Sequence, residues 1–132
     1  YAGLATVFAK DAWFDARNAK RDGNGEATKS EMRGDEWFPR GRDNIVAFIR
    51  KATEPNRTLH HGHMPEIEIL SDTAARGIVA MEDNNRYVQA EGQLHGSAGL
   101  HGFGHYHETY SRIDGRWYIQ TSILTRLRVE LD

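Results

Sequence analysis

The chain has 132 residues with a formal net charge of −2, and 39% of its residues are hydrophobic. These values predict one globular domain with a single core. The chain contains no cysteine, which excludes disulfides and zinc–thiolate sites. Its lysines and arginines are scattered, no signal peptide is visible, and no apolar run reaches the roughly 18–20 residues of a membrane span. We therefore expect a cytoplasmic protein without nucleic-acid or membrane partners.

The N-terminal part mixes three kinds of pattern. Apolar residues at helical spacing predict the end of an amphipathic helix in residues 1–10, and we expect the helix to start upstream of Tyr1. Residues 12–16 are short, aromatic and strand-like. Residues 17–40 are polar and contain the turn-forming run DGNG, which predicts a long loop or lid with a helical turn near residues 29–33.

The clearest helix runs from Gly41 to Thr53. Its apolar stripe consists of Ile45, Phe48 and Ile49, a spacing that predicts one buried face. An acidic residue in the first turn and basic residues in the last turn complement the helix dipole. Pro55 follows and ends the helix.

The second half of the chain reads as a series of strands. The predicted strands cover residues 57–71, 74–83, 103–113 and 116–131. Tight turns are predicted at Ser71-Asp72 and Asp114-Gly115, and a longer loop rich in Asn, Gly and Ser precedes the third strand. Helices first and long antiparallel strands afterwards predict an α+β fold, with helices packed on one face of a curved sheet.

The last hairpin predicts which side chains face the core. Its two-residue turn pairs Ile113 with Arg116, and directly opposed residues share a face. In the absence of a bulge, the further pairs are Arg112 with Trp117, Tyr110 with Ile119, Glu108 with Thr121 and Tyr106 with Ile123.

This register predicts which side chains face inward. The odd-numbered positions of residues 116–131 are then the core face. The predicted inward side chains are Tyr106, Glu108 and Tyr110, and the outward ones include His105, His107, Tyr118, Gln120 and Ser122. Glu108 is interpreted as a pocket acid or as a partner of Arg112 or Arg126.

A histidine-rich stretch, RTLHHGHMPEIEI, covers residues 57–69. It holds three of the seven histidines, which are His60, His61 and His63. Strict alternation from the isoleucines at the end of the stretch would place His61 and His63 on the core face. Gly62 and Pro65 are residues that mark a bulge, and one bulge would send His60 inward instead. The residues alone leave both alternatives open.

The order of four motifs resembles a known family. The motifs are the short aromatic strand with Asp15, the helix GRDNIVAFI, the stretch RTLHHGHMPEIEI, and GHYHETYSRIDGRWYI. Together they resemble a SnoaL-like domain of the nuclear-transport-factor-2-like superfamily, closest to the branch of scytalone dehydratase and bile-acid dehydratase. The resemblance implies that residues 1–132 are one such domain lacking its first helix. It also implies a cone-shaped α+β barrel, whose curved antiparallel sheet wraps around N-terminal helices and encloses a deep apolar pocket.

The resemblance also implies an activity and its residues. Relatives catalyse dehydration, isomerisation, cyclisation or epoxide opening without metal. The catalytic histidine of the dehydratases lies two residues after a threonine, as His60 follows Thr58. A second polar pocket residue corresponds to Asp83, and a third to Tyr106, where the dehydratase has a smaller amide. Ala16 stands where scytalone dehydratase has a pocket tyrosine, which argues against the scytalone reaction itself.

We therefore expect a cofactor-independent lyase or isomerase for an apolar, cyclic or carbonyl-containing substrate. His60 would be the general base, with Asp83 orienting it or sharing its proton, and Tyr106 would polarise the substrate oxygen. The expected substrate-binding residues are Tyr110, Glu108, Trp13, Met81, Ile119 and Ile123. One alternative is a non-catalytic ligand-binding domain of the same fold. Another is a metal enzyme that uses the pairs His61/His63 and His105/His107. Relatives are usually dimers, and we expect a homodimer formed through the outer face of the sheet.

Overall fold

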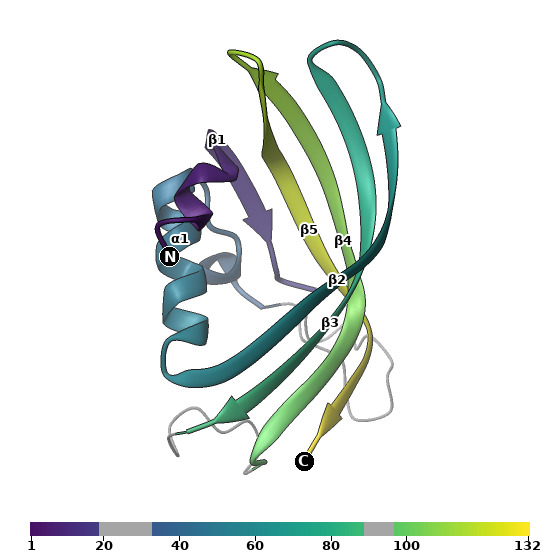
Figure 1. Ribbon diagram of the computed structural model, residues 1–132. Helices are drawn as coiled ribbons and strands as arrows, with labels where there is room; N and C mark the ends of the chain where they lie inside the picture. Colours follow the sequence, from purple (N-terminus) through teal and green to yellow (C-terminus); the bar gives the residue numbers. More distant parts are fainter. Residues whose placement is uncertain (19–32, 89–96) are drawn as a thin grey trace.

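The computed structural model describes residues 1–18, 33–88 and 97–132. Its elements are the 3₁₀ turn η1 (Leu4–Thr6), strand β1 (Phe8–Asp15), the 3₁₀ turn η2 (Asp35–Trp37), helix α1 (Arg42–Thr53) and the strands β2 (Asn56–Ile69), β3 (Ala74–Tyr87), β4 (Gly99–Ile113) and β5 (Arg116–Leu131). The strands form one sheet in the order β1-β5-β4-β3-β2. The sheet is curved and not closed, and α1 packs beside β1 on one of its faces (Figure 1). We call the face covered by α1 the inner face.

The α+β class is confirmed, with a mixed sheet. Strand β1 runs parallel to β5, whereas the other neighbouring strands are antiparallel. No helix in the described part of the chain is long and apolar enough to cross a membrane.

The predicted helix in residues 1–10 is wrong. A single 3₁₀ turn occupies Leu4–Thr6, and β1 begins at Phe8, which pairs with Ile119 of β5. Phe8 and Ala12 are buried in the core, so tertiary contacts override the local helical spacing. The turn predicted at the DGNG run and most of the helical turn predicted near residues 29–33 lie outside the described residues.

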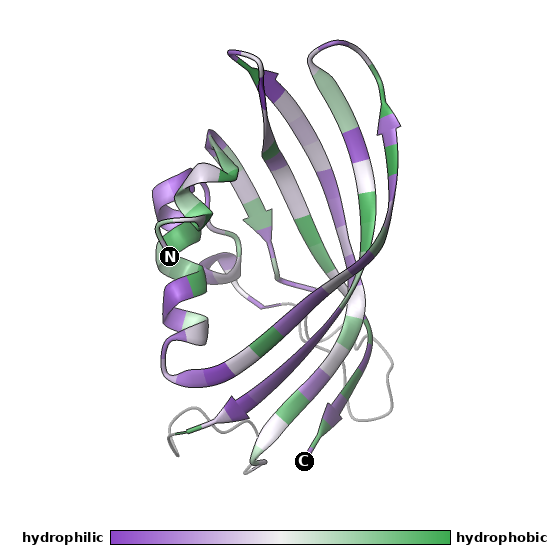
Figure 2. Ribbon diagram, viewed as in Figure 1, coloured by the Kyte–Doolittle hydropathy of each residue, from purple (hydrophilic) through white to green (hydrophobic). Residues whose placement is uncertain are grey.

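The core lies between α1 and the inner face of the sheet. Ile45 is completely buried, and the ring of Phe48 contacts the rings of Phe14 and Trp37 at centroid distances of 6.0 Å and 5.4 Å. Ile49 also packs against this cluster, which confirms the predicted apolar stripe. Figure 2 shows a hydrophobic middle part of α1 between hydrophilic residues.

The hairpin of β4 and β5 starts as predicted and then departs from the prediction. Asp114 and Gly115 have φ values of 50° and 79°, the left-handed pair that a tight two-residue turn requires. Pairing follows the predicted register as far as Tyr110 with Ile119, but Gln120 is then an extra residue in β5. A second extra residue, Leu127, follows further along.

These two bulges change which residues of β5 face inward. Because each extra residue reverses the alternation, the inward residues between the bulges are even-numbered. They are Ser122, Leu124 and Arg126, all buried. The predicted odd-numbered core face is therefore wrong in this part of β5, and Leu127 is 59% exposed. Glu108 pairs with Ser122 and Tyr106 with Leu124, each one position away from its predicted partner.

Strand β2 contains the bulge that decides the orientation of its histidines. The register shifts between Gly62 and Pro65, so that His60 pairs with Asp83 and Ile67 pairs with Gly77, all on the inner face. His61 pairs with Glu82 and points outward. The connection between the next two strands is shorter than predicted, since β3 extends to Tyr87 and β4 begins at Gly99.

Candidate active site

Three strands bring polar side chains together on the inner face. His60 comes from β2, Asp83 from β3 and Arg126 from β5. His60 Nε2 lies 3.8 Å from Asp83 Oδ2, with 41% of the His60 side chain exposed. The backbone at Asp83 lies in the C-terminal part of β3, which Figure 2 shows as markedly hydrophilic. A partly open imidazole thus lies beside a carboxylate that is only 2% exposed.

The Asp83 carboxylate is held by a network of donors. Arg126 Nη2 donates to Asp83 Oδ2 at 2.9 Å and Arg126 Nη1 donates to Oδ1, which makes a bidentate ion pair. Asn85 Nδ2 also donates to Oδ2, at 2.9 Å. His60 at 3.8 Å is beyond hydrogen-bond distance of this oxygen. Asp83 therefore acts on His60 through its charge.

The network leaves two polar atoms without partners in the described part of the chain. The buried Arg126 Nε donates no hydrogen bond there, and the buried Asn85 Oδ1 accepts none. Arg126 Nη1 additionally approaches the Met81 sulfur at 3.5 Å. The inner site is thus bounded on one side by an apolar core residue, because Met81 belongs to the buried cluster.

The surroundings of His60 favour its neutral form. Burial lowers the His60 pKa from 6.5 and outweighs the opposing effect of the Asp83 carboxylate, while the Arg126 guanidinium lowers the pKa further. A neutral imidazole is a proton acceptor near neutral pH. His60 is therefore able to act as a general base.

Tyr106 lies on β4 and packs against the core cluster. Burial raises the pKa of its hydroxyl to about 12, opposed by the charge of Arg126 and assisted by those of Asp83 and Glu108. The phenol therefore stays protonated at neutral pH and is a hydrogen-bond donor.

Glu108 and Tyr110 form a second polar group on the inner face. The Tyr110 hydroxyl donates to Glu108 Oε2 at 2.7 Å, and Ser122 Oγ donates to Glu108 Oε1 at 3.2 Å. Burial and the hydrogen bond to Glu108 raise the pKa of Tyr110. The partners of Glu108 are thus Tyr110 and Ser122, whereas Arg126, one of its anticipated partners, binds Asp83 instead.

The remaining predicted substrate-binding residues divide between the two faces. Met81 is 3% exposed in the core, and Ile119 packs against the same core. The rings of Trp13 and Phe38 contact each other edge to face, with a centroid distance of 5.3 Å. Trp13 pairs with Thr121 of β5, and both side chains face outward. Ile123 also faces outward, because the bulge at Gln120 reverses its orientation. The structure therefore does not bring Trp13 or Ile123 to His60.

The other histidines gather on the outer face. Glu82 Oε1 lies 3.1 Å from His61 Nδ1 and 3.7 Å from His63 Nε2, and its Oε2 lies 3.3 Å from His101 Nε2. Hydrogen bonds from His61 and His101 lower the pKa of Glu82.

The two predicted His-x-His pairs do not converge on a common centre. His105 and His107 lie further along β4, and His107 Nε2 is 3.1 Å from Thr125 Oγ1. Within residues 1–18, 33–88 and 97–132, no group of three or more His, Asp or Glu side chains is arranged to hold a metal ion.

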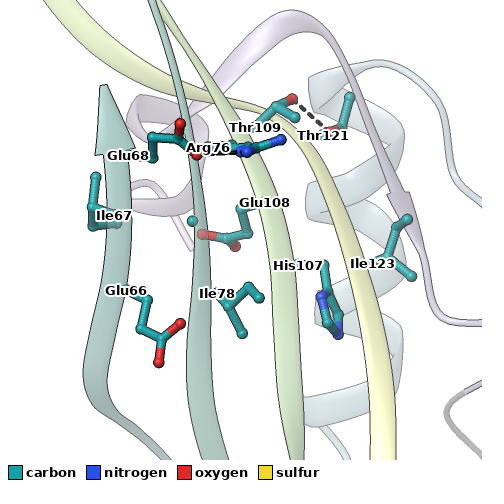
Figure 3. Close-up of a pocket in the computed structure, with 11 residues that line it drawn as sticks. Glu66, Ile67, Glu68, Arg76, Ile78, His107, Glu108, Thr109, Thr121 and Ile123 are labelled. Carbon is teal, nitrogen blue, oxygen red and sulfur yellow. Dashed lines mark hydrogen bonds and ion pairs between the residues drawn. The ribbon is translucent and has the colours of Figure 1, made fainter. Parts of the chain in front are cut away.

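A hollow of about 530 Å³ lies against the part of the sheet that is far from the Asp83 end of β3 (Figure 3). Most of its lining side chains face outward by the strand register. The lining residues are Glu66, Ile67, Glu68, Arg76, Gly77, Ile78, His107, Glu108, Thr109, Thr121 and Ile123. Glu108 contributes to its lining, whereas His60, Asp83 and Tyr106 do not, so the hollow lies apart from the His60 site.

Arg126 belongs to the inner site but is absent from the predicted site residues, since the sequence analysis considered it only as a partner of Glu108. An odd-numbered core face assigns residue 126 to solvent, whereas the bulge at Gln120 turns it inward. The available signal is Gly102 in the run GLHGFGH, because a residue without a side chain in a strand marks a close approach of neighbouring groups. Two side chains do approach each other over Gly102, those of Asp83 and Arg126.

The comparisons with known proteins agree with this architecture. A family model described as a SnoaL-like domain matches residues 1–122. A putative scytalone dehydratase from Novosphingobium aromaticivorans DSM 12444 is 19% identical, with a TM-score of 0.68, and the match covers 98% of this chain and 72% of that one. A type 2 hexachlorocyclohexane dehydrochlorinase is 17% identical, with a TM-score of 0.72 and coverage of 99% and 74%. The type 3 enzyme from Novosphingobium barchaimii LL02 is 16% identical, with a TM-score of 0.69 and coverage of 99% and 75%. The TM-scores show that these proteins share the fold of this chain.

Proposed function

Because this chain belongs to the SnoaL-like domain family, we propose that it is a cofactor-independent lyase or isomerase acting on a small molecule. The observation that carries the proposal is the inward-facing His60, whose neutral form is favoured and which lies 3.8 Å from a buried carboxylate. The dehydratase and dehydrochlorinase names of the similar structures support a reaction that removes a proton from carbon.

In the proposed reaction, His60 Nε2 takes a proton from the carbon next to a carbonyl group. The imidazolium that forms is stabilised by the charge of Asp83, which Arg126 and Asn85 keep in place. Tyr106 donates a hydrogen bond to the developing enolate oxygen. Release of a leaving group or return of the proton to another carbon then completes an elimination or an isomerisation.

The proposed substrate is an apolar, cyclic carbonyl compound. Met81 and Ile119 would supply apolar contacts on the inner face, and Tyr110 and Glu108 a second polar region beside Tyr106. The rival function is a binding domain of the same fold that holds such a compound without reacting with it.

Exchange of the α-protons of 2-tetralone in D₂O, followed by ¹H NMR, tests the proposal. This cyclic ketone requires only a base and an oxygen-binding donor, so exchange reports proton transfer without the natural substrate. His60→Ala should lower the exchange rate about 10²- to 10⁴-fold, the range of a general base. His61→Ala is the matched control, because His61 is the next residue of β2 and faces outward.

Binding of 2-tetralone without exchange above the buffer rate would support the binding domain instead. Equal losses in His60→Ala and His61→Ala would also contradict the assignment of His60.

We further propose a homodimer formed through the outer face of the sheet. This face presents Ile78, which is 40% exposed, together with acidic side chains on β2 and the basic Arg76 on β3. Such a mixture of apolar and oppositely charged groups allows one face to pair with a second copy of itself about a two-fold axis.

A further inference from the structure

One glycine lies where the side chains of two neighbouring strands meet. Gly102 of β4 pairs with Asp83 of β3, and Arg126 extends from β5 on the other side. A Cβ atom at Gly102 would collide with Arg126 Nη1 and with Asp83 Oδ1. The bidentate ion pair therefore crosses β4 at Gly102, where the absence of a side chain leaves room for it.

The same ion pair engages both oxygens of the Asp83 carboxylate. Arg126 binds both carboxylate oxygens, and Asn85 adds a hydrogen bond to Oδ2. Asp83 and Arg126 are 2% and 8% exposed, so solvent does not replace these bonds. His60 is left 3.8 Å away, without a hydrogen bond to the carboxylate.

We propose that Arg126 is a positioning residue for His60, and that Gly102 is required because it admits the ion pair between Arg126 and Asp83. Arg126 holds the carboxylate away from the imidazole, which leaves His60 Nε2 available to a substrate. Its own positive charge opposes a proton on His60. This role rests on the proposed function of His60 as a base.

The charges that act on His60 come from two elements. Asp83 lies on β3 and Arg126 on β5, and their effects on the imidazole are opposite in sign. Gly102 of β4 carries no side chain, and Asn85 of β3 is neutral. The phenols of Tyr87 on β3 and Tyr106 on β4 also interact with Asp83 and Arg126, and burial raises the pKa of both, so they stay neutral. Arg33 is a further cation that interacts with Arg126. Loss of Arg126 would leave the buried carboxylate of Asp83 with His60 at 3.8 Å and without its guanidinium partner, which favours the imidazolium.

The experiment is an NMR titration of the His60 Cε1–H signal in ¹³C-histidine-labelled protein, assigned with His60→Ala. Arg126→Met should raise the His60 titration midpoint by about one pH unit or more. Gly102→Ala keeps every charge but separates the pair, and should raise the midpoint in the same direction. Arg126→Lys keeps one positive charge without bidentate geometry, and an intermediate midpoint is expected.

Gly62→Ala is the matched control. Gly62 also lies in a strand of this site, but a Cβ atom there would meet only Val79 Cγ1 at 3.6 Å, an ordinary contact. Its His60 midpoint should equal that of the wild type. Circular dichroism establishes whether each variant is folded. If Arg126→Met is unfolded, Arg126→Lys takes its place in the comparison.

An unchanged His60 midpoint in folded Gly102→Ala and in a folded Arg126 variant would overturn the inference. The acid limb of 2-tetralone exchange should move with the midpoint in the same variants. Absence of exchange in the wild type would count against the proposed function, whereas wild-type exchange with an unchanged midpoint in the variants would count against the role of Arg126. The two failures are therefore distinguishable.

Discussion

At the scale of single residues, the inner site depends on how one carboxylate is shared. Asp83 has a guanidinium on one side and an imidazole on the other, and the guanidinium makes the hydrogen bonds. Because the hydrogen bonds of Asp83 go to Arg126 and not to the imidazole, the ring nitrogen of His60 stays available to a substrate. Asp83 then contributes charge.

The pH dependence of exchange follows from the His60 pKa. Raising the pH converts the imidazolium into the neutral base, so the 2-tetralone exchange rate should rise with pH and then level off. Because burial and Arg126 lower the pKa from 6.5, the half-maximal rate is expected below pH 6.5. Initial rates across pH 4–8 measure it, with His61→Ala expected to give the same profile. A midpoint above 6.5 would contradict the direction of the shift.

The buried ion pair also makes a stability prediction. Asp83→Ala leaves the guanidinium of Arg126 buried without its partner, which should lower the free energy of unfolding by about 3–5 kcal/mol. Glu68→Ala breaks the exposed pair with Arg76, whose side chains are 57% and 63% exposed, and should cost about 0–1 kcal/mol. Urea denaturation compares the two. Similar losses in both variants would show that burial does not matter to the Asp83 pair.

At the scale of elements, bulges decide what the long strands present. A strand with perfect alternation has one apolar and one polar face, and each extra residue exchanges the two. In β2 the bulge after Gly62 allows His60 and Ile67 to share the inner face. In β5 the bulge at Gln120 brings Arg126 inward. The site thus depends on two register shifts in different strands.

The hairpin turn between β4 and β5 gives a prediction at this scale. Gly115 has a φ of 79°, which a residue with a Cβ adopts at a cost of roughly 1–2 kcal/mol. Gly115→Ala should therefore lower the free energy of unfolding by about that amount. Gly3→Ala is the control, because a Cβ atom at Gly3 meets nothing within 4 Å and its φ is −62°. Urea denaturation that finds no difference between the two variants would contradict the strained turn.

At the scale of the whole molecule, the two faces of the sheet carry different groups of polar residues. The inner face carries the His60 site and the core, and the outer face carries the histidines around Glu82 and the hollow of about 530 Å³. This separation is the reason that we assign the reaction to one face and self-association to the other.

The homodimer proposal is tested by sedimentation velocity. The wild type should sediment as a dimer, and Ile78→Glu should shift it toward the monomer by placing a charge in the apolar part of the interface. Ala52→Glu adds the same charge on α1, an exposed position away from the outer face, and should leave the dimer intact. A wild-type monomer at micromolar concentrations would refute the interface.

The features that could be predicted from the amino-acid sequence are those that local chemistry specifies. The helical spacing of Ile45, Phe48 and Ile49 predicted α1, and Asp114-Gly115 predicted the turn and the first pairs of the hairpin. Gly62 and Pro65 are residues that mark a bulge, and they left the orientation of His60 open. Three features depend on contacts between distant parts of the chain. Residues 8–15 form a strand, β5 contains two bulges, and Arg126 therefore meets Asp83 over Gly102. The reason is physical: spacing and turn geometry act within a few residues, whereas the register of a strand is set by the neighbours with which it pairs.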